Sequence, residues 1–109
     1  MHEEWYSLKN FAPDLHVILV NDTAGMKGFE YERASFPATW ARMHEKGRVF
    51  YTSMGHREDV WISRQFQELV VGGITWAVGD AEADCSPNIS TVTPKANELP
   101  ELAEIQKKK

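Results

Sequence analysis

Residues 37–56, PATWARMHEKGRVFYTSMGH, carry the pattern that sets the expected fold. The segments 39–44 and 48–54 are rich in apolar, aromatic and β-branched residues, and the tripeptide 45–47 (EKG) separates them. Glycine can supply the positive φ of a tight connection, so this stretch predicts a β-hairpin. The first segment alternates, which suits an edge strand, whereas the second is more continuously apolar and is expected inside a sheet.

Apolar patterns on both sides of this stretch predict an α/β arrangement. Residues 16–20 (HVILV) form a short continuous apolar run, which is typical of a strand buried on both faces in a parallel sheet. Residues 63–78 have helical periodicity, with Ser63 placed to cap the start and Gly79 to end the helix. The expected buried stripe consists of Phe66, Leu69, Val70, Gly73, Ile74 and Ala77.

Two features of this predicted helix need an explanation. The pair Gly72-Gly73 should cost about 1 kcal/mol per glycine relative to alanine, and close approach of the helix to the sheet is the expected compensation. Trp61, Trp76 and Val78 lie off the stripe, which predicts a second contact surface or an exposed apolar patch.

Composition limits the class of protein. The 109 residues are 42% apolar, as expected for one globular core, and the net charge of −4 with basic residues clustered only in the last three lysines argues against nucleic-acid binding. No apolar run approaches the roughly 18 residues of a membrane span. Cys85 is the only cysteine and cannot form an internal disulfide. The chain as written suggests a cytoplasmic protein, and an upstream signal peptide would make it periplasmic or secreted.

His56 is the strongest local candidate for a functional residue. It follows a predicted strand, Gly55 lets the backbone turn or a ligand approach, and Glu58 stands two residues on as an orienting carboxylate. His56 could act as a general base, a metal ligand or a hydrogen-bond donor. The alternative is a histidine that caps the turn before a solvated helix entrance.

The N-terminal residues 2–6, HEEWY, form a second candidate cluster. Acidic residues beside a histidine could bind a divalent cation, and Trp5 and Tyr6 would suit stacking on a sugar ring. Adjacent glutamates near a terminus are also commonly only solvated. Phosphate-binding loops, zinc motifs and nucleophile elbows are missing from the sequence, so a self-contained nucleophilic enzyme is not expected, and whether the chain is an enzyme stays open.

Three segments in order resemble a known family. Glu4-Trp5-Tyr6 ahead of HVILV, then residues 37–56, then FQELVVGGITWAVG at 66–79 are similar to the ThuA-like domains of the trehalose-utilisation family. The phrase GRVFYTSMGH at 47–56 is especially similar to the family signature GKGRVFYTSLGH. The resemblance covers residues 3–94.

The resemblance implies a bacterial carbohydrate-utilisation domain with a partial flavodoxin-like or class I glutamine amidotransferase-like sandwich, built on a mostly parallel sheet plus the hairpin. Family domains are longer than this chain, so residues 1–79 are expected to be the C-terminal half of a ThuA-like domain, in effect a fragment, with 80–109 as an extended tail that could include a short helix. Such a half would leave apolar surface uncovered and favour association, including with a second copy.

The resemblance also implies site residues. His56 matches the family's Gly-His position, with Glu58 completing a His-x-Glu pattern like that of glutamine amidotransferases, and these two are the expected catalytic residues. Glu4, Trp5 and Tyr6 are the expected binding residues for a sugar or sugar-derived molecule, with Glu3 in place of the family's aspartate. The alternative function is a non-catalytic interaction module or an inactive remnant.

Overall fold

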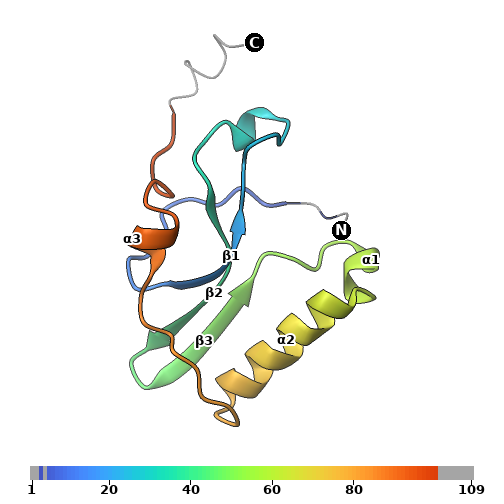
Figure 1. The fold of residues 1–109 in the computed structure, drawn as a ribbon, viewed down its shortest axis with the longest axis vertical. Helices are drawn as coiled ribbons and strands as arrows, with labels where there is room; N and C mark the ends of the chain where they lie inside the picture. The colour runs from blue at the N-terminus through green and yellow to red at the C-terminus, as the bar shows by residue number, and fades with distance from the viewer. Residues whose placement is uncertain (1–2, 4, 101–109) are drawn as a thin grey trace.

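The computed structural model describes residue 3 and residues 5–100, which form a small sheet, one long helix and a C-terminal segment that returns along the sheet (Figure 1). The strands are β1 (His16–Asn21), β2 (Phe36–His44) and β3 (Gly47–Thr52). The helices are the 3-10 turn η1 (Phe29–Tyr31) and the α-helices α1 (Glu58–Trp61), α2 (Arg64–Ala77) and α3 (Ile89–Val92).

The sheet is antiparallel, with three strands in the order β1-β2-β3 among the described residues. The prediction of a mostly parallel flavodoxin-like or amidotransferase-like sandwich is therefore wrong. It rested on β1 being covered on both faces, but β1 is an edge strand in which Ile18, Leu19 and Val20 are 42%, 39% and 39% exposed. A continuous apolar run puts apolar side chains on both faces of a sheet, but it does not fix the direction of the neighbouring strand.

The predicted hairpin is confirmed as β2 and β3, with Trp40 opposite Tyr51 and His44 opposite Gly47. The edge assignment is wrong, because β2 lies in the middle of the sheet and β3 at its side. The positive φ of the turn is also not at the glycine. It belongs to Glu45, at 55°.

Helix α2 is confirmed with the predicted caps. The Ser63 side chain accepts a hydrogen bond from the Phe66 backbone N–H at 3.5 Å. Gly79 has a φ of 89° and donates to the Trp76 carbonyl at 3.0 Å. With the bond from Asp80 N–H to the Thr75 carbonyl, also 3.0 Å, these contacts form a Schellman motif that ends the helix.

The buried face of α2 differs from the predicted stripe at two positions. Trp76, predicted to lie off the stripe, is 7% exposed, whereas Ile74, predicted to lie on it, is 57% exposed. Gly73 is the closest point to the sheet, because a Cβ atom there would lie 2.6 Å from the Phe50 ring. Gly72 has open space at the same position. Close approach therefore explains Gly73 but not Gly72.

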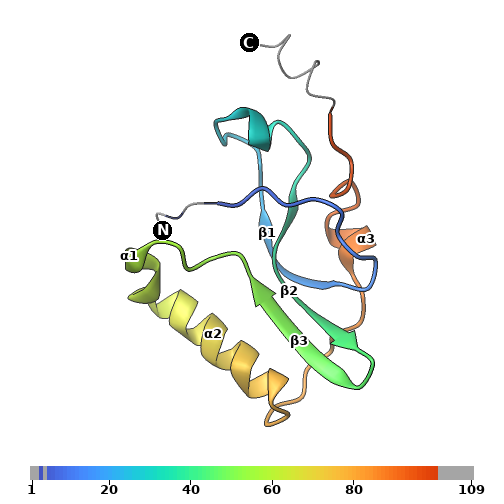
Figure 2. The ribbon, with the colours of Figure 1, turned by 180° about the vertical axis from the view of Figure 1, so that it is seen from behind.

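A hydrophobic core forms on the sheet face that carries Trp40 and Val17. Its aromatic centre is a stack of Trp40 on Tyr51, with ring centroids 4.3 Å apart, and Phe11 packs edge-on against Trp40 at 5.7 Å. The buried members of this core come from the loop before β1, the strands and the C-terminal segment: Phe11, Leu15, Val17, Phe36, Ile89 and Ala96. In Figure 2, which shows the molecule from behind, the N-terminal segment crosses the sheet.

Two asparagine side chains attach the C-terminal segment to the rest of the domain. Asn88 accepts from the Val17 N–H at 2.5 Å and donates to the Val17 carbonyl at 3.2 Å. Asn97 makes the same pair of bonds with Phe11, at 2.6 and 2.9 Å. The Asn88 amide thus takes the place that a strand beside β1 would occupy, and the Asn97 amide pairs in the same way with the segment before β1.

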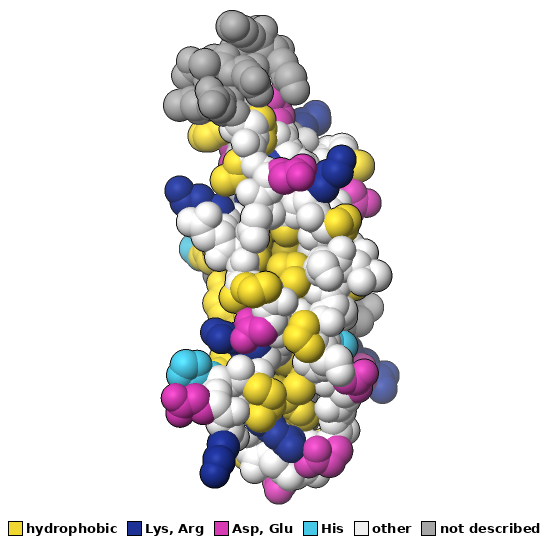
Figure 3. All heavy atoms as spheres, turned by 90° about the vertical axis from the view of Figure 1, so that its left-hand side faces the viewer, with side chains coloured by type: hydrophobic (Ala, Val, Ile, Leu, Met, Phe, Trp, Pro, Cys, Tyr) yellow, Lys and Arg dark blue, Asp and Glu magenta, His cyan; other side chains and the backbone are white. Residues whose placement is uncertain are grey.

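Residues 80–100 cover one side of the molecule. Figure 3 shows this side, where hydrophobic side chains form an interrupted band between charged ones. The division of the chain after residue 79 stays a prediction, and the expected helical turns over 98–106 fall mostly outside the described residues. Within the described part, no helix is both long and apolar enough to cross a membrane.

Candidate functional site

The loop after β3 brings two of the predicted site residues together. The Tyr6 hydroxyl lies 3.0 Å from Nδ1 of His56, across 50 positions of sequence. Their rings meet edge to face, with centroids 6.1 Å apart. Tyr6 is 39% exposed and His56 is also exposed, so the pair is accessible to a ligand from solvent.

The carboxylate of Glu3 fixes the backbone around His56. Gly55 N–H donates to Oε2 of Glu3 at 2.6 Å, and Arg57 N–H donates to Oε1 at 3.3 Å. One carboxylate thus holds the amides on both sides of His56. Sequence reasoning placed Glu3 among the acidic residues that could bind a cation and in place of the family's aspartate, whereas the structure gives it a positioning role.

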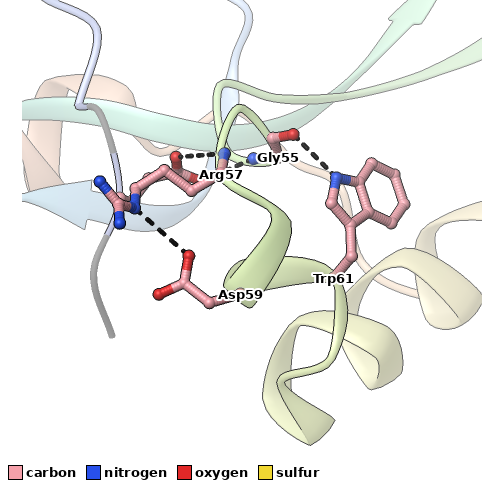
Figure 4. A network of polar contacts seen from close by, with 5 residues as sticks. Gly55, Arg57, Asp59 and Trp61 are labelled. Atoms are coloured by element: carbon pink, nitrogen blue, oxygen red, sulfur yellow. Dashed lines mark hydrogen bonds and ion pairs between the residues drawn. The ribbon is translucent and has the colours of Figure 1, made fainter.

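Gly55 allows the sharp turn that presents His56. Its φ of 115° is disfavoured for any residue with a side chain, and a Cβ atom there would lie 3.3 Å from the Trp61 ring. The Trp61 indole N–H donates to the Gly55 carbonyl at 2.8 Å, while Arg57 is held by Asp59 at 3.3 Å (Figure 4). Because Trp61 also packs edge-on against Phe66, the loop is tied to the start of α2.

Contacts from the loop between β1 and β2 hold the N-terminal segment in place. The Tyr31 hydroxyl donates to the Trp5 carbonyl, and Arg33 donates to the carbonyls of Leu8 and Ala96. The Arg33 guanidinium lies 4.1 Å from the centre of the Phe36 ring, and its burial lowers its pKa. Trp5 and Tyr6 are therefore presented by a segment that is anchored to the domain.

A cavity of about 500 Å³ is lined in part by chain neighbours of this pair of residues. Two of its lining residues are near the pair along the chain: Trp5 is next to Tyr6, and Met54 is two residues before His56. Its lining is Trp5, Leu19, Val20, Asn21, Asp22, Met26, Ala38 and Met54.

Asn21 is the unusual member of this lining. It is only 5% exposed, and its Nδ2 atom is buried with no hydrogen-bond partner within the described part of the chain. Buried polar groups in proteins are nearly always paired, and a rotation of this amide toward the cavity would let it donate to a ligand acceptor. In the sequence, Asn21 only marked the end of a strand, and no local signal would have singled it out.

The other predicted site residues are placed less closely. Glu58 is the exposed first residue of α1, and the structure brings Tyr6 rather than Glu58 to His56. Glu4 lies outside the described residues. The catalytic roles of His56 and Glu58 and the binding roles of Glu4, Trp5 and Tyr6 remain predictions.

The described residues do not fit a metal centre. Among residue 3 and residues 5–100, no group of three or more histidine, cysteine, aspartate or glutamate side chains is arranged to hold an ion. The divalent cation that the sequence allowed at the N-terminal cluster stays a prediction, because His2 and Glu4 lie outside the described residues, and no chemistry is assigned to it.

Comparison with known proteins gives one match. A family model described as trehalose utilisation, ThuA, matches residues 1–77. No curated protein matches the chain, and no solved structure matches it.

Proposed function

Because the chain belongs to the ThuA, trehalose utilisation, family, we propose that it serves carbohydrate utilisation by binding a sugar in the cavity beside Tyr6 and His56. The order of the three resembling segments supports the further proposal that residues 1–79 correspond to the C-terminal half of the family's domain. Trehalose or a related disaccharide is the proposed class of ligand.

The unpaired amide of Asn21 is the observation that carries this proposal. Leaving a buried donor unsatisfied costs about 1–3 kcal/mol, and a sugar hydroxyl that accepts from Nδ2 would offset that cost. Trp5 offers an aromatic surface for the apolar face of a sugar ring. Asp22 offers a carboxylate, one oxygen of which accepts from the Ala24 N–H at 3.1 Å. The lining thus combines stacking, donor and acceptor groups.

His56 is the proposed chemical group of the site. Tyr6 bonds to Nδ1 and so fixes the ring orientation, and Glu3 fixes the backbone on both sides. A histidine oriented in this way can accept or donate a proton at a bound hydroxyl. Glu58 and Glu4 remain proposed participants, and no bond-breaking step is assigned.

The test compares trehalose binding by the intact chain and by two variants, using calorimetry and ligand-observed NMR. Asn21→Leu removes the unpaired donor and keeps a similar volume, so the fold should be kept while trehalose binding is lost. His56→Ala should weaken binding, and His44→Ala, at the far end of β2, is the matched control. Trehalose binding that is unchanged in Asn21→Leu, or absent from the intact chain, would contradict the proposal.

A non-catalytic interaction module is the second candidate. The outer face of α2 exposes Val71, Ile74 and Val78 at 63%, 57% and 67%, spaced three or four residues apart. Such a helix, apolar on two faces, is typical of one that is covered on both sides. Light scattering tests this candidate: concentration-dependent association that Val71→Lys abolishes would support it, and a monomer at all concentrations would exclude self-association.

A further inference from the structure

A second cavity, of about 340 Å³, lies between α2, the sheet and residues 83–85. It shares no lining residue with the cavity beside Tyr6 and His56. Helix α2 packs against β3, with Gly73 on the Phe50 ring, and leaves Ile18 of β1 partly exposed at the cavity. The chain that leaves α2 then turns back across the sheet toward α3 and forms the other wall (Figure 1).

The floor of this cavity is apolar. Ala41 and Trp76 are 5% and 7% exposed and form a firm base, and Phe50 adds an aromatic surface. Ile18 is 42% exposed beside them. A ligand that covers apolar surface in contact with water gains about 25 cal/mol of binding free energy per Å² covered.

The rim of this cavity carries polar groups. Nδ1 of His16 donates to the Ser86 carbonyl at 2.8 Å, which leaves Nε2 as the remaining polar atom of the ring. Asp84 accepts from the Ser86 hydroxyl at 2.5 Å and from its backbone N–H at 2.9 Å. These two hydrogen bonds are the main causes of a lowered Asp84 pKa, with a smaller contribution from the charge of His16, and the carboxylate is therefore charged.

The charges at the rim are negative. Glu68 also lines the cavity, although Arg64 pairs with it at 2.9 Å on the solvent side. No lysine or arginine is part of the lining among the described residues. Arg48, which packs over the Trp76 ring at 5.3 Å, is paired with Glu82 at 2.7 Å. A ligand that fits must therefore supply the hydrogen-bond donors and the positive charge.

We infer that this cavity binds a small hydrophobic amine, with its apolar body on Trp76 and Phe50 and its ammonium group toward Asp84. The volume is at the lower end of ligand cavities, which begin at about 300 Å³, and suits a body of one ring. An ammonium group supplies three donors to a rim that carries the carboxylates of Asp84 and Glu68. An anion of the same shape would meet like charge at Asp84 and Glu68.

The test uses three probes of similar shape on the full chain: 2-phenylethylamine, 2-phenylethanol and 3-phenylpropionate. Binding is measured by calorimetry and by amide chemical shifts at Gly72 and Gly73. The amine should bind more tightly than the alcohol, and the acid should bind at least about tenfold more weakly than the amine, because like charges oppose it. Acid binding equal to amine binding, or no binding of the amine at millimolar concentration, would overturn the inference.

Variants locate the binding site. Gly72→Leu adds a side chain where a Cβ meets nothing within 4 Å, so it should fill the cavity without disturbing the fold and abolish amine binding. Val71→Ala, on the neighbouring outer face of α2, is the control and should bind normally. Asp84→Asn should weaken the amine but not the alcohol. Amine binding that survives Gly72→Leu would refute the site, and Asn21→Leu separates this result from the sugar proposal because it should leave amine binding unchanged.

Discussion

The adjacent glycines Gly72 and Gly73 of α2 allow two alanine variants to be compared that gain the same helix propensity and differ only in packing. Replacing either Gly72 or Gly73 by alanine should gain about 1 kcal/mol of helix stability, because glycine is the poorer helix former. At Gly72 that gain stands alone, since a Cβ atom meets nothing within 4 Å. At Gly73 the new Cβ would lie 2.6 Å from the Phe50 ring, which forces α2 or the ring to move.

The two variants should therefore differ by the cost of overpacking alone. Extra methyl groups in a packed core typically cost about 1–3 kcal/mol, so Gly72→Ala should be more stable than Gly73→Ala by about that amount. Urea denaturation followed by circular dichroism measures both free energies of unfolding. Repeating the pair in a Phe50→Leu background should shrink the difference, because leucine can yield to the new methyl group.

Equal stability of the two alanine variants would refute this reasoning. So would a difference that persists unchanged in the Phe50→Leu background, because the steric conflict would then lie elsewhere. Either result would mean that α2 does not approach β3 as closely as the structure shows.

Three further predictions concern other parts of the chain. Asn88→Ala should lower the free energy of unfolding by about 1–3 kcal/mol in urea denaturation, because it leaves both polar groups of Val17 unpaired. Ser86→Ala should raise the pKa of Asp84 toward 3.8 in a carboxyl NMR titration. Because the pKa is lowered in the folded state, the stability that this contact adds is present at neutral pH and is lost as the pH falls through the folded-state pKa. The variant should therefore lose less stability on acidification. Glu45→Gly should raise the midpoint of thermal unfolding, gaining about 0.5–1 kcal/mol by relieving a positive φ of 55°, and an unchanged midpoint would contradict it.

Local signals in the sequence predicted the local structures well. The hairpin and α2 each depend on residues close in the chain, such as the Ser63 cap and the Gly79 termination, and both are confirmed. The direction of β1 depends on which strand lies beside it, and nothing within residues 16–20 encodes that choice. The same limit explains the stripe of α2, where the buried Trp76 lies under Arg48 of β3, a contact between residues 28 positions apart.

The candidate site was predictable only in part for the same reason. His56 was found because it follows a strand and a glycine, and Tyr6 because of its aromatic neighbours. Tyr6 and His56 are about fifty positions apart in the sequence, and so are Glu3 and the loop amide to which it is hydrogen-bonded. Asn21 became a candidate only when its burial and its unpaired amide were visible.

The amide of Asn88 has a consequence for how the chain behaves in concentrated solution. An edge strand with apolar side chains on both faces, as β1 has at Ile18 and Leu19, is a template on which another chain can add a strand and begin to aggregate. Asn88 already takes the outward N–H and carbonyl of Val17, so an incoming strand finds no partner at that position. The C-terminal segment thus protects the exposed edge of the sheet as well as filling its core.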